Sequence, residues 1–73
     1  MKQIEYGRNE NTGEEFWRYG ARLYGKLGEE VWQQEFEPGN VLFAPVPQDE
    51  QAEALRWVKH LDWASRNEIK RLA

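Results

Sequence analysis

The sequence predicts a small α+β domain in which an antiparallel sheet of three to four strands packs against one C-terminal helix. Two patterns lead to this fold class. Apolar and polar residues alternate over residues 3–6 and 17–23, and apolar residues recur at helical spacing over about 49–72. The chain has 73 residues, which is the size of one small domain, so we assign residues 1–73 to a single domain.

The N-terminal two-thirds is expected to form an antiparallel meander. Turn-forming residues gather at 9–13, around Gly25 and Gly28, and at 38–40. The segments between these turns carry the aromatic and β-branched residues that strands favour. We therefore expect strands over about residues 2–8, 15–24, 29–36 and 41–45.

Segment 15–24 is predicted to be one long strand, because its residues alternate with a period of two. Arg18 and Arg22 would share the open face of the sheet, with Gly20 as a flat patch between them. Such a face is usually polar and solvated, which is the simplest interpretation of the two arginines. The side chains that would face the helix are Trp17, Tyr19, Ala21 and Leu23.

A helix is the competing interpretation of this region. Residues 12–15 fit a capping box, with Thr12 as the N-cap and Glu15 at the third helical position. Three glycines would then lie inside the helix, each costing about 1 kcal/mol relative to Ala, so strands are preferred. Segment 29–36 stays open between strand and helix, because its Glu and Gln residues suit a helix.

The C-terminal helix is expected to begin just after Pro47 and to cover about residues 49–72, with the last turns frayed. Acidic residues gather at its start and basic residues at its end, which complements the helix dipole. Asp62 interrupts the apolar stripe and is predicted to mark a kink, fraying or departure from the core. The stripe itself consists of Ala54, Leu55, Val58, Leu61, Ser65, Ile69 and Leu72.

No catalytic, metal or cofactor site is expected. His60 and Ser65 are the only His and Ser, and on a helix they point about 140° apart. Nucleophilic catalysis needs such groups within hydrogen-bond reach, and one His with scattered carboxylates has no metal-ligand spacing. The chain has no Cys and no phosphate-loop motif. No apolar run reaches the roughly 20 residues that span a bilayer, so no membrane partner is expected.

Binding is therefore the expected activity, and three regions are candidates for it. The first is an edge strand at 2–8 that adds a partner's extended segment, and the second is the pair of arginines on the open sheet face. The third is a basic helix face around Trp63, which lies away from the apolar stripe. The candidate partner-binding residues are Ile4, Tyr6, Arg8, Arg18, Arg22, Arg56, Lys59, Trp63 and Arg66. Acidic turns are a further docking surface for a basic partner, through Glu14, Glu15, Glu29, Glu30, Glu35 and Glu37.

The N-terminal run Lys2-Gln3-Ile4-Glu5-Tyr6-Gly7-Arg8 and the segment Phe16-Trp17-Arg18-Tyr19-Gly20 lie in a Trp-rich, mildly acidic chain. In these features it resembles the small transcription regulators of lytic bacteriophages, such as those of phages that infect plant-pathogenic Xanthomonas. The resemblance implies a non-enzymatic protein that binds the host's multisubunit RNA polymerase, including the N-terminal region of its largest subunit. It also implies interference with the sigma factor at initiation and promotion of terminator read-through.

The resemblance further implies a protein of the host bacterial cytoplasm, monomeric when free, that meets nucleic acid only through the polymerase. It rests on no diagnostic motif, so no functional residue is transferred by it. Two alternatives stay open: another phage counter-defence inhibitor that binds a protein, and a small nucleic-acid-binding module that acts through Trp63.

Overall fold

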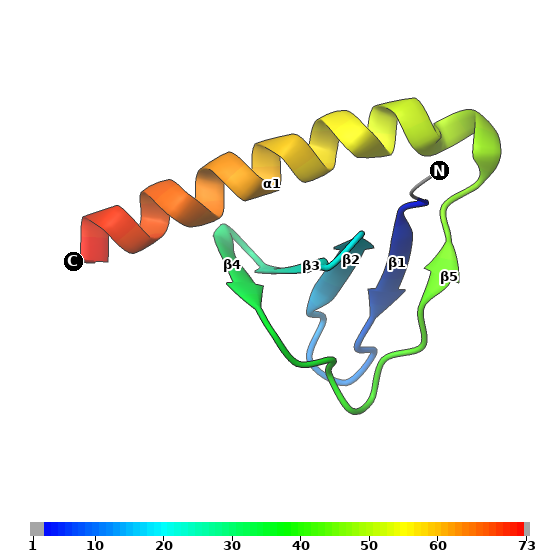
Figure 1. The fold of residues 1–73 in the computed structure, drawn as a ribbon. Helices are drawn as coiled ribbons and strands as arrows, with labels where there is room; N and C mark the ends of the chain where they lie inside the picture. The colour runs from blue at the N-terminus through cyan, green and yellow to red at the C-terminus, as the bar shows by residue number, and fades with distance from the viewer. Residues whose placement is uncertain (1–2, 73) are drawn as a thin grey trace.

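The computed structural model describes residues 3–72, with side chains described for residues 3–67. It confirms the α+β class: a C-terminal helix packs on an antiparallel sheet in the order β4-β3-β2-β1-β5 (Figure 1). The sheet has five strands rather than three to four. The elements are β1 (Glu5–Arg8), β2 (Glu15–Tyr19), β3 (Arg22–Leu27), β4 (Glu30–Gln34), β5 (Ala44–Pro45), the 3₁₀ turn η1 (Gln48–Glu50) and α1 (Gln51–Leu72).

The prediction of one long strand over 15–24 is wrong, because this segment is the β2–β3 hairpin. Tyr19 pairs with Arg22, which leaves Gly20 and Ala21 as a two-residue loop. Gly20 has φ of 61°, and a type II′ hairpin turn requires a positive φ at this first loop position.

The hairpin changes which side chains share a face of the sheet. Trp17 pairs with Tyr24, so these two side chains point to the helix side. Arg18 pairs with Leu23, so these two point to the other side. Leu23 is therefore not on the helix-covered face where the alternation had placed it.

Segment 29–36 forms a strand over Glu30–Gln34, which decides between the two interpretations of this region. It pairs with β3 through a second two-residue loop, Gly28-Glu29, and Gly28 again has φ of 61°. Gly25 in β3 lies under the Trp32 indole, and a Cβ there would come within 2.4 Å of the ring. Because Gly25 has no side chain, the Trp32 indole can pack directly over the backbone of β3.

The predicted N-terminal edge strand is also wrong. β1 pairs with β2 on one side and with β5 on the other, so it lies inside the sheet. The predicted strand 41–45 shortens to Ala44–Pro45, and the three residues before it cross the sheet face instead of pairing. The edges of the sheet are β4 and the two-residue β5.

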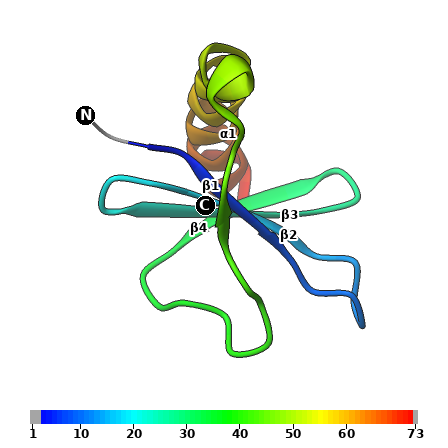
Figure 2. The same cartoon turned by 90° about the vertical axis from the view of Figure 1, so that its right-hand side faces the viewer.

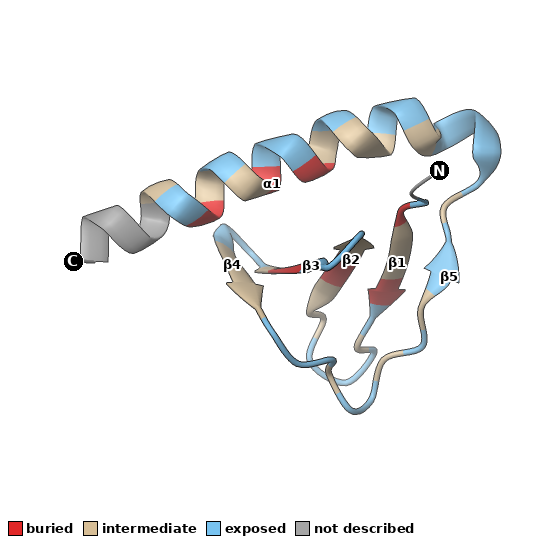
Figure 3. Ribbon diagram, viewed as in Figure 1, coloured by how far each residue is buried: buried red, intermediate tan, exposed pale blue. Residues whose placement is uncertain are grey.

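α1 lies across one face of the sheet, and its buried residues lie along the side of the helix next to the strands (Figure 3). Val58, Leu61 and Ser65 are buried, which confirms that part of the predicted stripe. Val58 and Leu61 pack with Ile4, Trp17 and Tyr24 in the core. Ile69 and Leu72, also predicted for the stripe, lie outside the described side chains.

Asp62 marks neither a kink nor a frayed end, because α1 runs on to Leu72. Its carboxylate accepts a hydrogen bond of 2.9 Å from the Tyr24 hydroxyl and one of 3.2 Å from the Gln33 amide. Gln33 also donates to the buried Ser65 hydroxyl at 3.0 Å. The polar residues within the apolar stripe are therefore satisfied by two strands of the sheet.

The start of α1 is joined to β1 by the side chain of Gln51. Its amide nitrogen donates to the Val46 carbonyl at 2.7 Å and to the Ile4 carbonyl at 3.3 Å, and its oxygen accepts from the Ile4 amide at 3.1 Å. Because these bonds satisfy backbone groups of the strand, the helix start is anchored to the sheet.

The face of the sheet opposite α1 is covered by the loop of residues 35–43 (Figure 2). Val41 and Phe43 approach Gly7, where an added Cβ would lie 2.4 Å from the Val41 side chain. On the same face Phe16 and Leu23 are buried. The expectation of a polar, water-facing second face is therefore wrong, and the fold has three layers: helix, sheet and loop. No helix in the described part of the chain is both long and apolar enough to cross a bilayer.

Candidate binding surfaces

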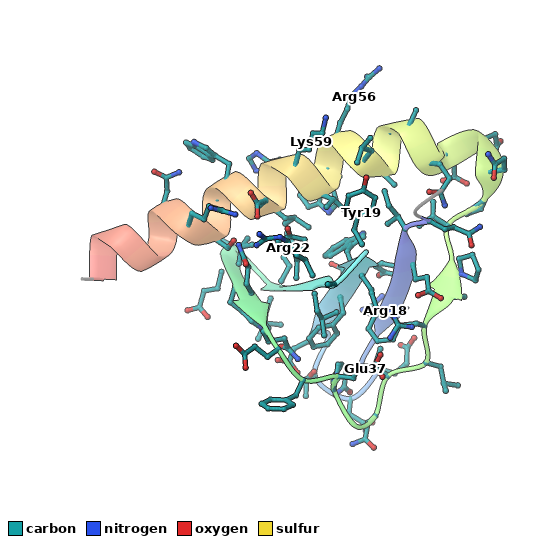
Figure 4. The ribbon with its side chains drawn as sticks, viewed as in Figure 1. Arg18, Tyr19, Arg22, Glu37, Arg56 and Lys59 are labelled. Carbon is teal, nitrogen blue, oxygen red and sulfur yellow. The ribbon has the colours of Figure 1, made fainter. Side chains whose placement is uncertain are left out.

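Arg18 holds the 35–43 loop against the sheet. Its Nε donates to the Glu5 carboxylate at 2.8 Å, and its guanidinium also pairs with Glu37 of the loop (Figure 4). The same guanidinium lies 4.6 Å from the centre of the Phe43 ring. Two carboxylates and an aromatic ring engage this side chain, so it stabilises the fold and is not a free contact for a partner.

Arg22 lies on the opposite face of the sheet from Arg18, because the hairpin separates their registers. Its Nη1 is 3.4 Å from the Gln33 oxygen and 4.0 Å from the Asp62 carboxylate. The two arginines do not form one patch, and the prediction of a shared open face is wrong.

The N-terminal candidates belong mainly to the core. Ile4 is 1% exposed and packs under α1. The Tyr6 hydroxyl donates a hydrogen bond to the Glu15 carboxylate at 2.6 Å. Burial, and after it this hydrogen bond, raises the pKa of Tyr6 to about 12. Arg8, at the end of β1, is the exposed member of this group.

The third candidate region is a continuous surface, which we call the outer stripe: Arg56, Lys59, Trp63 and Arg66 of α1. At about 100° per residue these positions fall within an arc of about 80°, on the side of the helix away from the sheet. All four are exposed, and Trp63 is 62% exposed. Trp63 therefore stays in solvent and does not fold back onto the sheet edge.

A series of aromatic rings joins the core to the outer stripe. It begins with Tyr6 and Trp17, whose ring centres are 5.2 Å apart, and Trp57 packs on Trp17 at 5.7 Å. His60 stacks on Trp57 at 5.5 Å and 26°, and Trp63 lies 6.1 Å from His60 at 30°. His60 is exposed to solvent, and its ring also supports the exposed indole of Trp63.

Two further exposed apolar side chains were not identified from the sequence. Phe36 is 80% exposed and Leu42 is 93% exposed, and both belong to the loop that covers the second sheet face. We call these two residues the loop pair. Val41 and Phe43 turn inward to the sheet, and Leu42 between them turns outward. For Leu42 the sequence signal was the apolar run after the turn at 38–40, which was interpreted as a buried strand.

Hydrogen bonds brace the backbone beside Phe36. The Trp32 indole donates to the Gln34 oxygen at 2.8 Å, and the Gln34 amide donates to the Phe36 carbonyl at 2.6 Å. The Arg18–Glu37 ion pair follows one residue later. The exposed phenyl ring of Phe36 is thus carried by a segment that is tied to the sheet.

The described residues hold no group of three or more His, Asp or Glu side chains arranged to bind a metal ion. A groove of ≈ 590 Å³ opens beside the start of α1. Its lining is mostly amide and apolar: Gln3, Ile4, Tyr19, Gln48, Gln51, Ala52 and Leu55.

Comparisons with protein-family models, with curated proteins and with solved structures find no match for the chain.

Proposed function

We propose that this chain is a phage protein that binds the host's multisubunit RNA polymerase. In this proposal it interferes with the sigma factor at initiation and promotes terminator read-through, in the host cytoplasm and without catalysis. The observation that carries the proposal is the resemblance of residues 2–8 and 16–20 to phage transcription regulators. These segments make up most of β1 and β2, so the resemblance concerns the scaffold, and the contact surface has to be argued from exposure.

The loop pair supplies the exposed apolar side chains that best suit a protein partner. Protein interfaces are centred on large apolar side chains that lose their water on binding, and Phe36 and Leu42 are exposed side chains of this kind. The loop that carries them is held by the Arg18–Glu37 ion pair and by Gln34. A preorganised loop loses less conformational entropy on binding, which favours affinity.

Acidic side chains lie near the loop pair in the chain, including the exposed Glu35 and Glu37. They match a partner whose apolar pocket is rimmed by basic residues, and complementary charge increases the rate of association. The N-terminal region of the largest polymerase subunit is the partner that the resemblance names. We therefore propose that this region receives the loop pair.

Affinity capture with the intact tagged protein tests the proposal. Core polymerase subunits should be recovered from bacterial lysate after nuclease treatment and in high salt. The double variant Phe36→Ser/Leu42→Ser should lose them. The matched control is Leu27→Ser, which removes an exposed leucine from the β3–β4 hairpin and should capture polymerase normally.

Transcription from a sigma-dependent promoter with purified holoenzyme gives a second readout. The wild-type protein should reduce initiation, and the loop-pair variant should restore it. If the wild-type protein captures a nuclease or another defence complex and no polymerase, the counter-defence alternative replaces this proposal. If polymerase is captured equally by the double variant, the function stands and the loop pair is the wrong surface.

A further inference from the structure

We propose that the outer stripe of α1 binds single-stranded nucleic acid directly, with base stacking on Trp63 and phosphate contacts to Arg56 and Lys59. This site goes beyond the polymerase-binding proposal. It lies on the helix, whereas the loop pair lies across the sheet on the opposite side of the molecule (Figure 2).

The spacing of the stripe is the first argument. Its residues follow one another at intervals of three, four and three, so they form one line along the helix. At 1.5 Å per residue the line is about 15 Å long. The core residues Val58, Leu61 and Ser65 occupy the other side of the helix, so the stripe is not needed to bury α1.

The charge of the stripe is the second argument. It carries three positive charges in a chain with a net charge of −3, so positive charge is concentrated on this face. Arg56 and Lys59 project away from the sheet (Figure 4), and within residues 3–67 neither side chain has a carboxylate partner. Arg66 is paired with Asp62 at 3.1 Å and contributes less. Unpaired cations of this kind are available to phosphates.

The orientation of Trp63 is the third argument. The Trp63 indole is exposed, but one side of it lies against His60, which in turn stacks on Trp57. These contacts hold the ring in place. Sequence-independent binding of single strands combines such an aromatic platform with a positively charged track. An acidic peptide needs only the cations of the stripe for its carboxylates. A nucleic acid also has bases that stack on the indole, so the indole favours nucleic acid as the ligand.

The test measures fluorescence anisotropy of a labelled 15-nucleotide oligothymidylate titrated with the full chain at several salt concentrations. Binding should weaken steeply with salt. Trp63→Ala should weaken it about five- to 150-fold, the loss of one stacked base, whereas Trp63→Phe should retain most of the affinity. The double variant Arg56→Gln/Lys59→Gln should lower the slope of log affinity against log salt by about 1.4.

The matched control is Arg8→Gln/Lys26→Gln, which removes the same charge from the sheet and should bind like the wild type. Circular dichroism on each variant confirms that the fold is kept. The proposal is overturned if the wild type fails to bind the oligonucleotide in 50 mM salt, or if Trp63→Ala binds as well as the wild type. It is also overturned if a blunt duplex binds more tightly than the single strand, or if polyglutamate of equal charge competes as well as the oligonucleotide.

This outcome is separable from that of the polymerase proposal. Phe36→Ser/Leu42→Ser should leave oligonucleotide binding unchanged, and Trp63→Ala should leave nuclease-resistant capture of polymerase unchanged. Failure of one site therefore does not imply failure of the other.

Discussion

The two faces of the sheet are covered in different ways. α1 covers one face with a continuous core, in which Leu61 is fully buried and Asp62, Gln33 and Ser65 satisfy one another. The 35–43 loop covers the other face with a few contacts around Gly7 and Arg18. We infer from this difference that the contacts under the helix contribute most of the stability. The loop is held by fewer contacts and presents two exposed apolar side chains.

The largest expected effect is on the helix side. Leu61→Ala leaves a cavity in the core and should lower the free energy of unfolding by about 2–5 kcal/mol. Leu42→Ala on the loop side should change it by less than about 0.5 kcal/mol, because that side chain is already in water. Urea denaturation of both variants measures the contrast, and equal effects would contradict it.

The next effect concerns the hydrogen bond between Tyr24 and Asp62. Tyr24→Phe removes a donor to a carboxylate and should cost about 1.5–3 kcal/mol of stability. Tyr6→Phe is the comparison, because its hydroxyl also donates to a carboxylate, but to that of Glu15 in β2 and not to one of the helix. Thermal unfolding at neutral pH measures both, and no loss in Tyr24→Phe would contradict the assigned bond.

Alkaline pH tests the same hydrogen bond between Tyr24 and Asp62. Burial, followed by the hydrogen bond to Asp62, raises the pKa of Tyr24 to about 12, above its ordinary value of 10. A group whose pKa is raised in the folded state contributes its stability below pH 10 and loses it as the pH rises to 12. The free energy of unfolding should fall over this interval, and the fall should be smaller in Tyr24→Phe than in the wild type.

A smaller effect is expected at the loop side. Gly7→Ala places a Cβ 2.4 Å from Val41 and should displace the loop, at a cost of about 1–3 kcal/mol. Gly39→Ala is the control, because nothing lies within 4 Å of its added Cβ. Hydrogen exchange should accelerate in residues 41–43 of Gly7→Ala while α1 stays protected. Faster exchange throughout α1 would show that the two faces are not independent.

The smallest effect is expected from the ion pair that closes the loop. Glu37→Gln removes the Arg18–Glu37 pair, which is partly exposed, and should cost at most about 1 kcal/mol. The free energy of binding to polymerase should fall by more than the free energy of unfolding, because the loop pair would be less preorganised. An unchanged capture would show that the pair contributes nothing to binding.

Local rules in the chain were enough to predict several parts of the fold. The helix follows from the period of its apolar residues and from Pro47 before it, and its buried positions Val58, Leu61 and Ser65 were predicted correctly. The turn at 9–13 forms where predicted and is closed by the Asn9 side chain, which accepts from the amides of Asn11 and Thr12. These features depend on neighbours within a few residues, so the sequence expresses them directly.

The register of the sheet was a harder problem. Leu23 and Tyr24 are adjacent and both apolar, so either can continue an alternating pattern. The two-residue loop at Gly20 decides that Tyr24 faces the helix and Leu23 faces the loop. A single turn therefore reversed the assignment of Arg22, and with it the predicted arginine patch. The outer stripe could be predicted correctly, because the helical period alone fixes which residues share a face of the helix.

The sequence by itself determined the fold class, the C-terminal helix and the basic, aromatic stripe on that helix, because helical spacing and helix-start signals are local. Only the tertiary structure decided the rest: that β1 lies inside the sheet, that the Asp62 carboxylate accepts a hydrogen bond from Tyr24, 38 positions away, and that a loop covers the second sheet face. These features depend on which distant segments meet, and many pairings are compatible with the same local pattern until the whole core is packed.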